Sequence, residues 1–263
     1  MSKRFSDQVI WITGASSGIG ESLARALSAE GADIVLTARR RARLEALAAE
    51  LPGESLIVPL DLTDGEAIPE AIQQVMAWKG RVDILINNAG ISQRARVEDC
   101  ELSTVRRVME INFFAIVDLT QQVLPTMLAR GSGHIVNMSS VAGYVSTPLR
   151  SVYCASKHAL RAWSDSLRSE ISGRGLSVTT ICPGYVRTEI SSAALTGDGT
   201  AKGGDDGVVA RAMPADVAAA KMVTAIYRRR REFFVGGKEI YAIYLQRWMP
   251  GLVAWFAPRA APE

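Results

Sequence analysis

Residues 9–20 read VIWITGASSGIG, and this stretch decides which fold the sequence is expected to adopt. Residues 9–13 form an apolar and β-branched run that ends at a glycine, which is the pattern of a short buried strand. Glycines stand at positions 14, 18 and 20, and Leu23 and Leu27 then recur at helical spacing. Such a turn lets the backbone approach a pyrophosphate, which the free N–H groups and the dipole of a helix N-terminus attract. Because the G-x3-G-x-G spacing is weak alone, the predicted dinucleotide site rests on its place between a strand and a helix.

Short apolar runs alternate with helical patterns along the rest of the chain. The runs that predict buried strands are residues 33–37, 55–60, 82–86, 134–138, 176–182 and 232–235. Apolar residues at helical spacing lie between them, such as Leu44, Leu47 and Leu51, and residues 214–230 predict a further helix. The alternation predicts an α/β fold with a parallel sheet and helices on both faces, because parallel neighbours need crossover connections. Ligands of such sheets bind at the carboxyl ends of the strands.

Composition and charge exclude several classes of protein. The 263 residues, 48% hydrophobic and 22% charged, fit one large α/β domain. The net charge of +3 includes the basic runs 39–43 and 228–231, but neither is flanked by a nucleic-acid motif, so no nucleic-acid partner is expected. Three cysteines and two histidines, His134 and His158, form no metal-ligand or disulfide pattern, so we expect no metal and a reducing compartment. Without a signal-peptide pattern or a long apolar run, we expect a cytoplasmic protein.

Four polar side chains are candidates for catalysis. Tyr153 and Lys157 are four residues apart in a helical segment and therefore share one face of the helix. A nearby ammonium favours the phenolate, so Lys157 is expected to lower the pKa of Tyr153 from its ordinary value of about 10. A hydroxyl from Ser139-Ser140, at the end of the fifth strand, can hydrogen-bond a substrate oxygen as charge develops on it. Asn112 is expected in the helix that follows the fourth strand.

The end of the second strand bears on the choice of cofactor. An acidic residue there would bind the adenosine ribose of NAD, whereas a basic residue accommodates the 2′-phosphate of NADP. No acidic residue occurs between Asp33 and Glu45, and residues 39–43 read RRRAR. Cations are disfavoured at the start of a helix by its dipole, so an anionic partner explains this run better than a solvated surface does. The sequence thus predicts NADP(H), with Arg39 as the first choice for the phosphate contact and Arg40 as the second, and NAD(H) as the alternative.

Taken in order, these motifs resemble the short-chain dehydrogenase/reductase family over about residues 8–190. The matching residues are Thr13–Gly20, Asp61, Asn88-Ala89-Gly90, Asn112, Ser140, Tyr153-Cys154-Ala155-Ser156-Lys157 and Pro183-Gly184. The resemblance implies a single-domain Rossmann fold over residues 1–263, with a doubly wound, mostly parallel seven-stranded sheet and helices on both faces. It also implies hydride transfer between a nicotinamide cofactor and a carbonyl or alcohol.

The resemblance assigns a role to each matching residue. In the family the serine polarises the substrate carbonyl, the tyrosine exchanges its proton, the lysine lowers the pKa of the tyrosine and holds the nicotinamide ribose, and the asparagine anchors a relay water. Ser140 is preferred over Ser139 because its thirteen-residue offset from Tyr153 matches the family pattern. The expected catalytic residues are Asn112, Ser140, Tyr153 and Lys157. The expected cofactor contacts are Gly14, Ser16, Ser17, Gly18, Ile19, Gly20, Arg39, Arg40, Asp61, Leu62, Asn88, Ala89, Gly90, Tyr153, Lys157, Pro183, Gly184, Val186 and Thr188.

Two details refine the resemblance. Residues 92–94 (SQR) and 153–160 (YCASKHAL) are similar to the branch that contains hydroxysteroid dehydrogenases and dehydrogenase/reductases of the member 7 type. Those proteins are often anchored by an N-terminal membrane helix, a segment that we do not expect in this sequence. Ser17 stands where some NADP-dependent relatives carry a lysine or arginine, so Arg39 carries more of the 2′-phosphate prediction. Asp61 is placed to accept from the adenine amino group or to cap a turn.

The substrate is expected to be a small apolar carbonyl or alcohol. Residues 94–98, 141–150 and a substrate loop at 189–213 are expected to build its pocket, with Val141, Val145, Leu149 and Leu195 as the apolar contributors. Within that loop, residues 191–207 are rich in Gly, Ser, Thr and Asp and predict a mobile segment.

The C-terminal tail, residues 238–263, carries five aromatic residues close to the basic run at 228–231. We expect the tail to pack at a subunit interface or over the pocket of a homodimer or homotetramer. Peripheral contact with an anionic membrane is the alternative, because aromatic and basic residues together suit the lipid interface. The competing function is a non-catalytic dinucleotide-binding regulator, which the intact set of four catalytic candidates argues against.

Overall fold

A seven-stranded parallel sheet forms the centre of the computed structural model, which describes residues 3–204 and 212–256. The strand order is β3-β2-β1-β4-β5-β6-β9, and every neighbouring pair is parallel. The strands are β1 (Val9–Thr13), β2 (Asp33–Ala38), β3 (Ser55–Pro59), β4 (Ile84–Asn87), β5 (Gly133–Met138), β6 (Leu176–Pro183) and β9 (Glu232–Val235). A separate parallel pair joins β7 (Val186–Arg187) to β8 (Met213–Pro214). The order reverses between β1 and β4, so the predicted doubly wound fold is confirmed.

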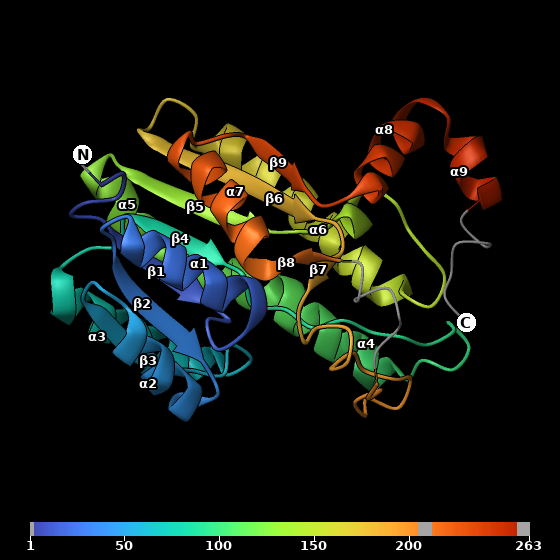
Figure 1. The fold of residues 1–263 in the computed structure, drawn as a ribbon, viewed down its shortest axis with the longest axis horizontal. Helices are drawn as coiled ribbons and strands as arrows, with labels where there is room; N and C mark the ends of the chain where they lie inside the picture. The colour runs from blue at the N-terminus through green and yellow to red at the C-terminus, as the bar shows by residue number, and fades with distance from the viewer. Residues whose placement is uncertain (1–2, 205–211, 257–263) are drawn as a thin grey trace.

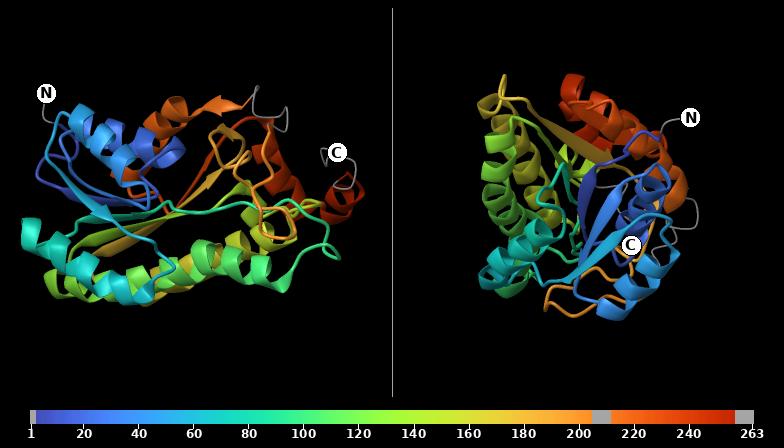
Figure 2. Two further views of the ribbon diagram at one scale, coloured as in Figure 1. Left: turned by 90° about the horizontal axis from the view of Figure 1, so that it is seen from below. Right: turned by 90° about the vertical axis from the view of Figure 1, so that its left-hand side faces the viewer.

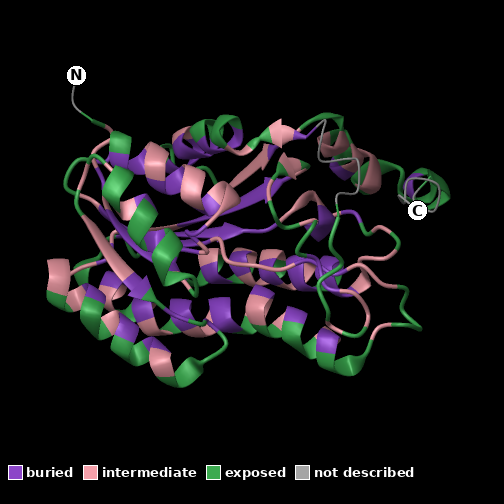
Figure 3. Cartoon of the chain, turned by 60° about the horizontal axis from the view of Figure 1, so that its bottom comes forward, coloured by how far each residue is buried: buried purple, intermediate pink, exposed green. Residues whose placement is uncertain are grey.

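Helices cover both faces of the sheet (Figures 1 and 2). On one face α1 (Gly18–Ala29), α2 (Arg41–Glu50) and α7 (Ala215–Tyr227) bury Leu27, Leu44 and Met222 against the strands. On the other, α3 (Ile68–Lys79), α5 (Ala115–Arg130) and α6 (Ser151–Glu170) bury Val75 and Leu119 among others. The helix α4 (Leu102–Met109) runs into α5 through a π-helical turn, Glu110–Phe114. In Figure 3 the central strands are buried, and each flanking helix turns a buried stripe towards the sheet, as amphipathic spacing dictates.

Two element ends differ from the sequence prediction by two residues or more, each with a local contact or backbone conformation beside it. The strand β4 begins at Ile84 rather than at residue 82, and just before it the Asp83 carboxylate accepts the backbone N–H of Val9 at 2.8 Å. The helix α7 ends at Tyr227 rather than at residue 230, because Arg229 takes a left-handed φ of +47° that a helix cannot continue through.

The loop and tail predicted after β6 are only partly described. Residues 191–204 form turns, in which Leu195 bridges to Gln93 and to Ala201, while residues 205–211 of the predicted substrate loop lie outside the described residues. The tail forms two short helices, α8 (Tyr241–Trp248) and α9 (Pro250–Phe256), which stand away from the sheet (Figure 1), and residues 257–263 lie outside the description. Trp248 is 77% exposed, and Tyr244 packs edge-on against Phe234. In the described parts of the chain we find no helix long and apolar enough to cross a membrane.

His134 lies wholly buried at the amino end of β5. Its Nε2 is 2.8 Å from the hydroxyl of Thr179, whose only proton is donated to the carbonyl of Arg230 at 2.6 Å. The Thr179 oxygen therefore accepts from the ring, which fixes the neutral tautomer with its proton on Nε2. Burial, with a smaller contribution from Arg229, lowers the pKa of His134 to about 3.

This burial predicts an acid-dependent loss of stability. Between pH 6.5 and about 3 the unfolded chain binds a proton at His134 that the folded chain does not bind, so stability falls as the pH falls. We expect the free energy of unfolding of the wild type to drop by about 2 kcal/mol more between pH 7 and pH 5 than that of His134→Gln. Urea denaturation at the two pH values measures this difference. Equal drops in the two proteins would show that folding does not lower the pKa of His134.

Candidate functional site

A cavity of about 370 Å³ opens at the carboxyl ends of the strands. Its wall contains every residue predicted to contact the cofactor or to act in catalysis, except Gly20 and Asn112, which lie behind it. Glu189, Ile190 and Ala193 of the predicted substrate loop also line the cavity, as does Ser139, the alternative to Ser140. The sequence did not point to the rest of the wall, namely Thr37, Ala38, Leu60, Ile91, Ser92, Ile111 and Met138. Most of these directly follow a strand or neighbour a predicted contact, which is the signal that could have identified them.

The predicted apolar contributors lie elsewhere. Val141, Val145, Leu149 and Leu195 are absent from the wall of this cavity, and Val145 and Leu195 are buried in the surrounding structure. The apolar side chains on the wall include Ile91, Ile111, Met138 and Ile190 instead. Leu195, for example, is buried against Val108 and Val152.

The turn between β1 and α1 is wound so tightly that it excludes side chains. A Cβ at Gly20 would lie 2.3 Å from the carbonyl oxygen of Gly14, and Gly14 and Gly18 adopt left-handed φ values of +67° and +58°. Within the described chain, the Ser17 side chain caps none of the first amides of α1. The helix N-terminus therefore faces the cavity with free donors, which fits the pyrophosphate of a dinucleotide.

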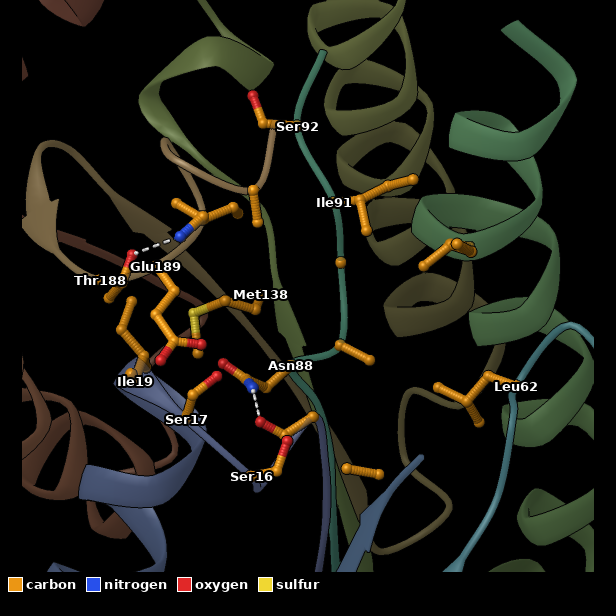
Figure 4. Close-up of a pocket in the computed structure, with 18 of the residues that line it drawn as sticks. Ser16, Ser17, Ile19, Leu62, Asn88, Ile91, Ser92, Met138, Thr188 and Glu189 are labelled. Atoms are coloured by element: carbon orange, nitrogen blue, oxygen red, sulfur yellow. Dashed lines mark hydrogen bonds between the residues drawn. The ribbon is translucent and has the colours of Figure 1, made fainter. Parts of the chain in front are cut away.

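Asn88 and Thr13 clamp this turn to the end of β4. The Thr13 hydroxyl accepts the backbone N–H groups of Asn88 and Ala89 at 3.0 and 3.1 Å, and the Asn88 amide donates to the Thr13 carbonyl at 2.9 Å. A longer bond of 3.3 Å reaches the Gly14 carbonyl (Figure 4). Asn88 thus positions the glycine turn together with Thr13, a functional residue that was not predicted from the sequence.

Asp61 makes the turn that was one of its two expected roles. Its Oδ1 accepts the backbone N–H of Thr63 at 3.0 Å and the Thr63 hydroxyl at 2.9 Å. Its Oδ2 lies 3.9 Å from Nη1 of Arg39. Asp61 also lines the cavity, and the expected adenine contact of its second oxygen stays a prediction.

Tyr153 and Lys157 face the cavity from one side of α6, and both are buried. Lys157 Nζ lies 5.9 Å from the centre of the Tyr153 ring and donates to the carbonyl of Met138 at 2.9 Å. The Ser140 hydroxyl, at the end of β5, donates to the Pro183 carbonyl at 3.3 Å and accepts the Ala142 N–H at 3.1 Å. Three groups able to hold or move a proton therefore meet beside the glycine turn.

The charge states of this pair differ from the sequence prediction. Burial of the phenol raises the pKa of Tyr153, and a hydrogen bond with Ser140 opposes that rise only in part. Burial also lowers the pKa of Lys157, to about 8. The expected lowering of the Tyr153 pKa is therefore wrong for this structure, because removal of the phenol from water outweighs the groups that lower its pKa. Tyr153 is held as the neutral phenol, which is a proton donor.

Asn112 lies in the π-helical turn rather than in a regular helix. Its Oδ1 accepts the Ile91 N–H at 2.8 Å, and its Nδ2 donates to the Ile91 carbonyl at 2.9 Å and to the Ser156 hydroxyl at 3.0 Å. Ser156 in turn donates to the Tyr153 carbonyl at 2.8 Å. Asn112 thus ties the segment after β4 to the helix that carries Tyr153, a contact that sequence spacing could not reveal.

The two arginines at the start of α2 lie in different surroundings. Arg40 donates to the hydroxyls of Ser16 and Ser17 at 3.0 and 2.8 Å, so its guanidinium lies over the glycine turn. It also donates to the carboxylate of Glu189 at 3.1 Å. Arg39 is more exposed and faces Asp61. Both arginines line the cavity, with Arg40 the more firmly held of the two.

Glu239, at the start of the tail, fills a hollow formed by glycines. Its Oε1 accepts the N–H groups of Tyr185 and Gly237 at 2.8 and 2.9 Å. A Cβ at Gly184 or Gly236 would lie 2.0 or 2.5 Å from the same oxygen. Because Gly184 lines the cavity, this carboxylate fastens the tail to the cavity wall. No sequence motif singles out Glu239, although the Gly-Gly pair directly after β9 is a signal of a close approach.

Removal of this carboxylate should loosen the wall. We expect Glu239→Ala to lower the free energy of unfolding by about 1–2 kcal/mol, because two backbone donors lose their acceptor. Glu239→Gln keeps an acceptor oxygen and should retain most of that stability. Urea denaturation of the three proteins tests the assignment, and an equal loss in both variants would contradict it.

The chain was compared with known proteins. A family model described as short chain dehydrogenase matches residues 8–198. Dehydrogenase/reductase SDR family member 7B of Danio rerio is 42% identical over 257 residues, which cover 94% of this chain and 83% of the relative. A crystal structure of a short-chain dehydrogenase from Streptomyces avermitilis has a TM-score of 0.83 at 32% identity and covers 94% of this chain and 97% of its own. The closed form of a serine dehydrogenase complexed with NADP+ has a TM-score of 0.78 at 28% identity, with 87% and 94% covered. The resemblance drawn from the motifs is confirmed.

Proposed function

Because this chain belongs to the short-chain dehydrogenase/reductase family of oxidoreductases, we propose that it uses NADP(H) to interconvert a carbonyl and a primary or secondary alcohol. The observation that carries the proposal is the meeting of Tyr153, Lys157 and Ser140 in one cavity with the glycine turn. A cofactor bound there supplies or accepts the hydride. Apolar side chains on the wall, such as Ile91 and Ile190, favour a small apolar substrate.

The residues of the chain divide the proton chemistry among them. Tyr153 gives its hydroxyl proton to the substrate oxygen in the direction of reduction, for which its neutral state prepares it. Ser140 can turn from its long bond with Pro183 to donate to the same oxygen as negative charge develops there. Lys157, with its pKa of about 8, exchanges a proton near neutral pH and can restore the phenol. Asn112 holds α6 in register with the segment after β4 and is proposed to anchor a relay water.

The preference for NADP(H) is supported by the charge at the end of β2. Arg39 and Arg40 line the cavity where β2 ends, the position at which the adenosine ribose is expected. A planar guanidinium suits a phosphate, because its N–H groups match two phosphate oxygens at once. Arg40 is already oriented by the hydroxyls of Ser16 and Ser17, so little side-chain freedom is lost when it binds.

The proposed assembly is a homodimer or homotetramer in the cytoplasm. The exposed aromatic side chains of the tail, Tyr241, Trp248 and Trp255 among them, support a packing role between copies of the chain. Their neighbour Arg247 also suits contact with an anionic membrane, which is the alternative for the same surface.

The role of Tyr153 predicts a selective loss of turnover. We expect Tyr153→Phe to reduce kcat/KM by about 10²–10⁴-fold, because the phenyl ring has no proton to give. The affinity for NADPH should stay within about twofold of the wild type, since the ring keeps its place. Steady-state kinetics over a panel of steroid, retinoid and aromatic ketones, combined with fluorescence titration of NADPH, measures both. Substantial residual turnover would remove Tyr153 from the mechanism.

The proposed preference for NADP(H) predicts that substitutions of the two arginines affect NADPH binding more than NADH binding. We expect Arg39→Ala and Arg40→Ala to weaken NADPH binding by about tenfold or more while NADH binding changes little, because each loses charge-assisted bonds to the phosphate. Arg41→Ala is the matched control, since Arg41 lies on the same helix, pairs with Glu45 and does not line the cavity. Equal losses for NADPH and NADH would refute the preference for NADP(H).

A further inference from the structure

Glu189 pairs with two arginines near the start of α2, and one of them, Arg40, lines the cavity. Its Oε2 accepts from Nη1 of Arg40 at 3.1 Å, and its Oε1 accepts from Nη1 of Arg43 at 2.9 Å. Glu189 follows Thr188 directly and lines the same cavity, and Figure 4 draws it close to Ser17. A carboxylate of the substrate loop thus reaches nearly 150 residues back along the chain to the expected 2′-phosphate site.

The guanidinium of Arg40 donates hydrogen bonds both to neutral serine hydroxyls and to the charged carboxylate of Glu189. Its Nε and Nη2 donate to the hydroxyls of Ser16 and Ser17, which orient the guanidinium without changing its charge. Among the described residues, Nη1 alone contacts an anion, and that anion is the Glu189 carboxylate. A phosphate accepts hydrogen bonds from the same forked pair of guanidinium N–H groups as a carboxylate does. One anion at this guanidinium therefore repels a second one.

The ion pairs of Glu189 with Arg40 and Arg43 form at neutral pH, but they are weak enough for another anion to replace Glu189. Hydrogen bonds from Arg43 and then from Arg40 hold the pKa of Glu189 below its ordinary value, so its carboxylate is charged at neutral pH. All three side chains are about half exposed, and ion pairs of that kind contribute little stability. A phosphate carrying up to two charges can displace a single carboxylate from such a site.

Displacement of Glu189 also affects the residues that follow it along the cavity wall. Ile190 and Ala193 come next in the chain and line the cavity, and Leu195 bridges to Gln93 beyond them. The contact with Arg40 and Arg43 therefore fastens one end of this segment to α2.

We propose that Glu189 is a specificity-determining residue whose carboxylate competes with the cofactor's 2′-phosphate for Arg40, while Arg43 helps to hold that carboxylate in place. The competition lowers the preference for NADP(H) over NAD(H), and the arrival of the phosphate frees the segment 189–195 from α2. This inference rests on the proposed use of NADP(H) and adds a residue that opposes it.

The test isolates the 2′-phosphate with two nucleotides that differ by that group. Adenosine 2′,5′-bisphosphate and 5′-AMP are titrated by calorimetry into the wild type, Glu189→Gln and Glu45→Gln. The control Glu45→Gln removes the same charge from α2, but Glu45 pairs with Arg41 and does not touch Arg40 or Arg43. We expect Glu189→Gln to tighten the bisphosphate by about three- to tenfold, the range of two surface ion pairs, and to leave 5′-AMP within about twofold. The control should leave both unchanged.

The outcomes separate the inference from the proposed function. A wild-type preference for the bisphosphate that Glu189→Gln leaves unchanged overturns the competition and leaves the use of NADP(H) standing. If the wild type shows no preference for the bisphosphate but Glu189→Gln does, the proposed use of NADP(H) is refuted and the competition by Glu189 stands. If neither protein shows the preference, both proposals are refuted. Weaker 5′-AMP binding by Glu189→Gln would contradict the inference, because it would make Glu189 a ribose ligand.

Hydrogen exchange supplies a second readout that needs no turnover. The bisphosphate should speed amide exchange of residues 189–195 in the wild type, because their anchor on α2 is released. In Glu189→Gln the exchange should be fast already and should not respond. Unchanged exchange in the wild type on saturation with the bisphosphate would contradict the release of the segment.

Discussion

The close approach of Gly20 to the carbonyl of Gly14 is the constraint on which the rest of the site depends. With only 2.3 Å available to a Cβ at position 20, α1 can start so near the end of β1 only if that position has no side chain. The helix then presents its first amides to the cavity, and Asn88 closes the turn from β4 by bonding to Thr13. The cofactor site is therefore a property of backbone packing, to which side chains add selectivity.

Burial determines the charge states of Tyr153 and Lys157, which α6 presents to the same cavity. The same removal from water raises the pKa of Tyr153 and lowers that of Lys157, because the charged form is the phenolate in one case and the ammonium in the other. Both shifts favour neutral side chains and leave the tyrosine with a proton to give. Asn112 and Ser156 keep this helix in register with the segment after β4, so the buried pair stays beside the glycine turn.

The strands could be predicted from the sequence because a parallel sheet covered on both faces needs continuous apolar runs, and the site followed from their carboxyl ends. The ends of elements were harder to predict, since no apolar pattern indicates that Arg229 adopts the left-handed conformation that ends α7. The contact of Glu189 with Arg40 and that of Glu239 with Tyr185 join residues far apart in the chain, which spacing cannot reveal. Spacing also suggested the wrong direction for the Tyr153 pKa, because it places Lys157 nearby without saying how much water both lose.

The protonation state of Tyr153 in the folded protein tests most directly whether burial makes this residue a proton donor. Carbon-13 labelling of the tyrosine rings, with the Tyr153 signal identified by its loss in Tyr153→Phe, allows that phenol to be titrated by NMR. We expect its signal to remain that of the neutral phenol up to a pH above the ordinary tyrosine pKa of about 10. A midpoint at or below 10 would contradict the claim and would return the control of this proton to the charge of Lys157.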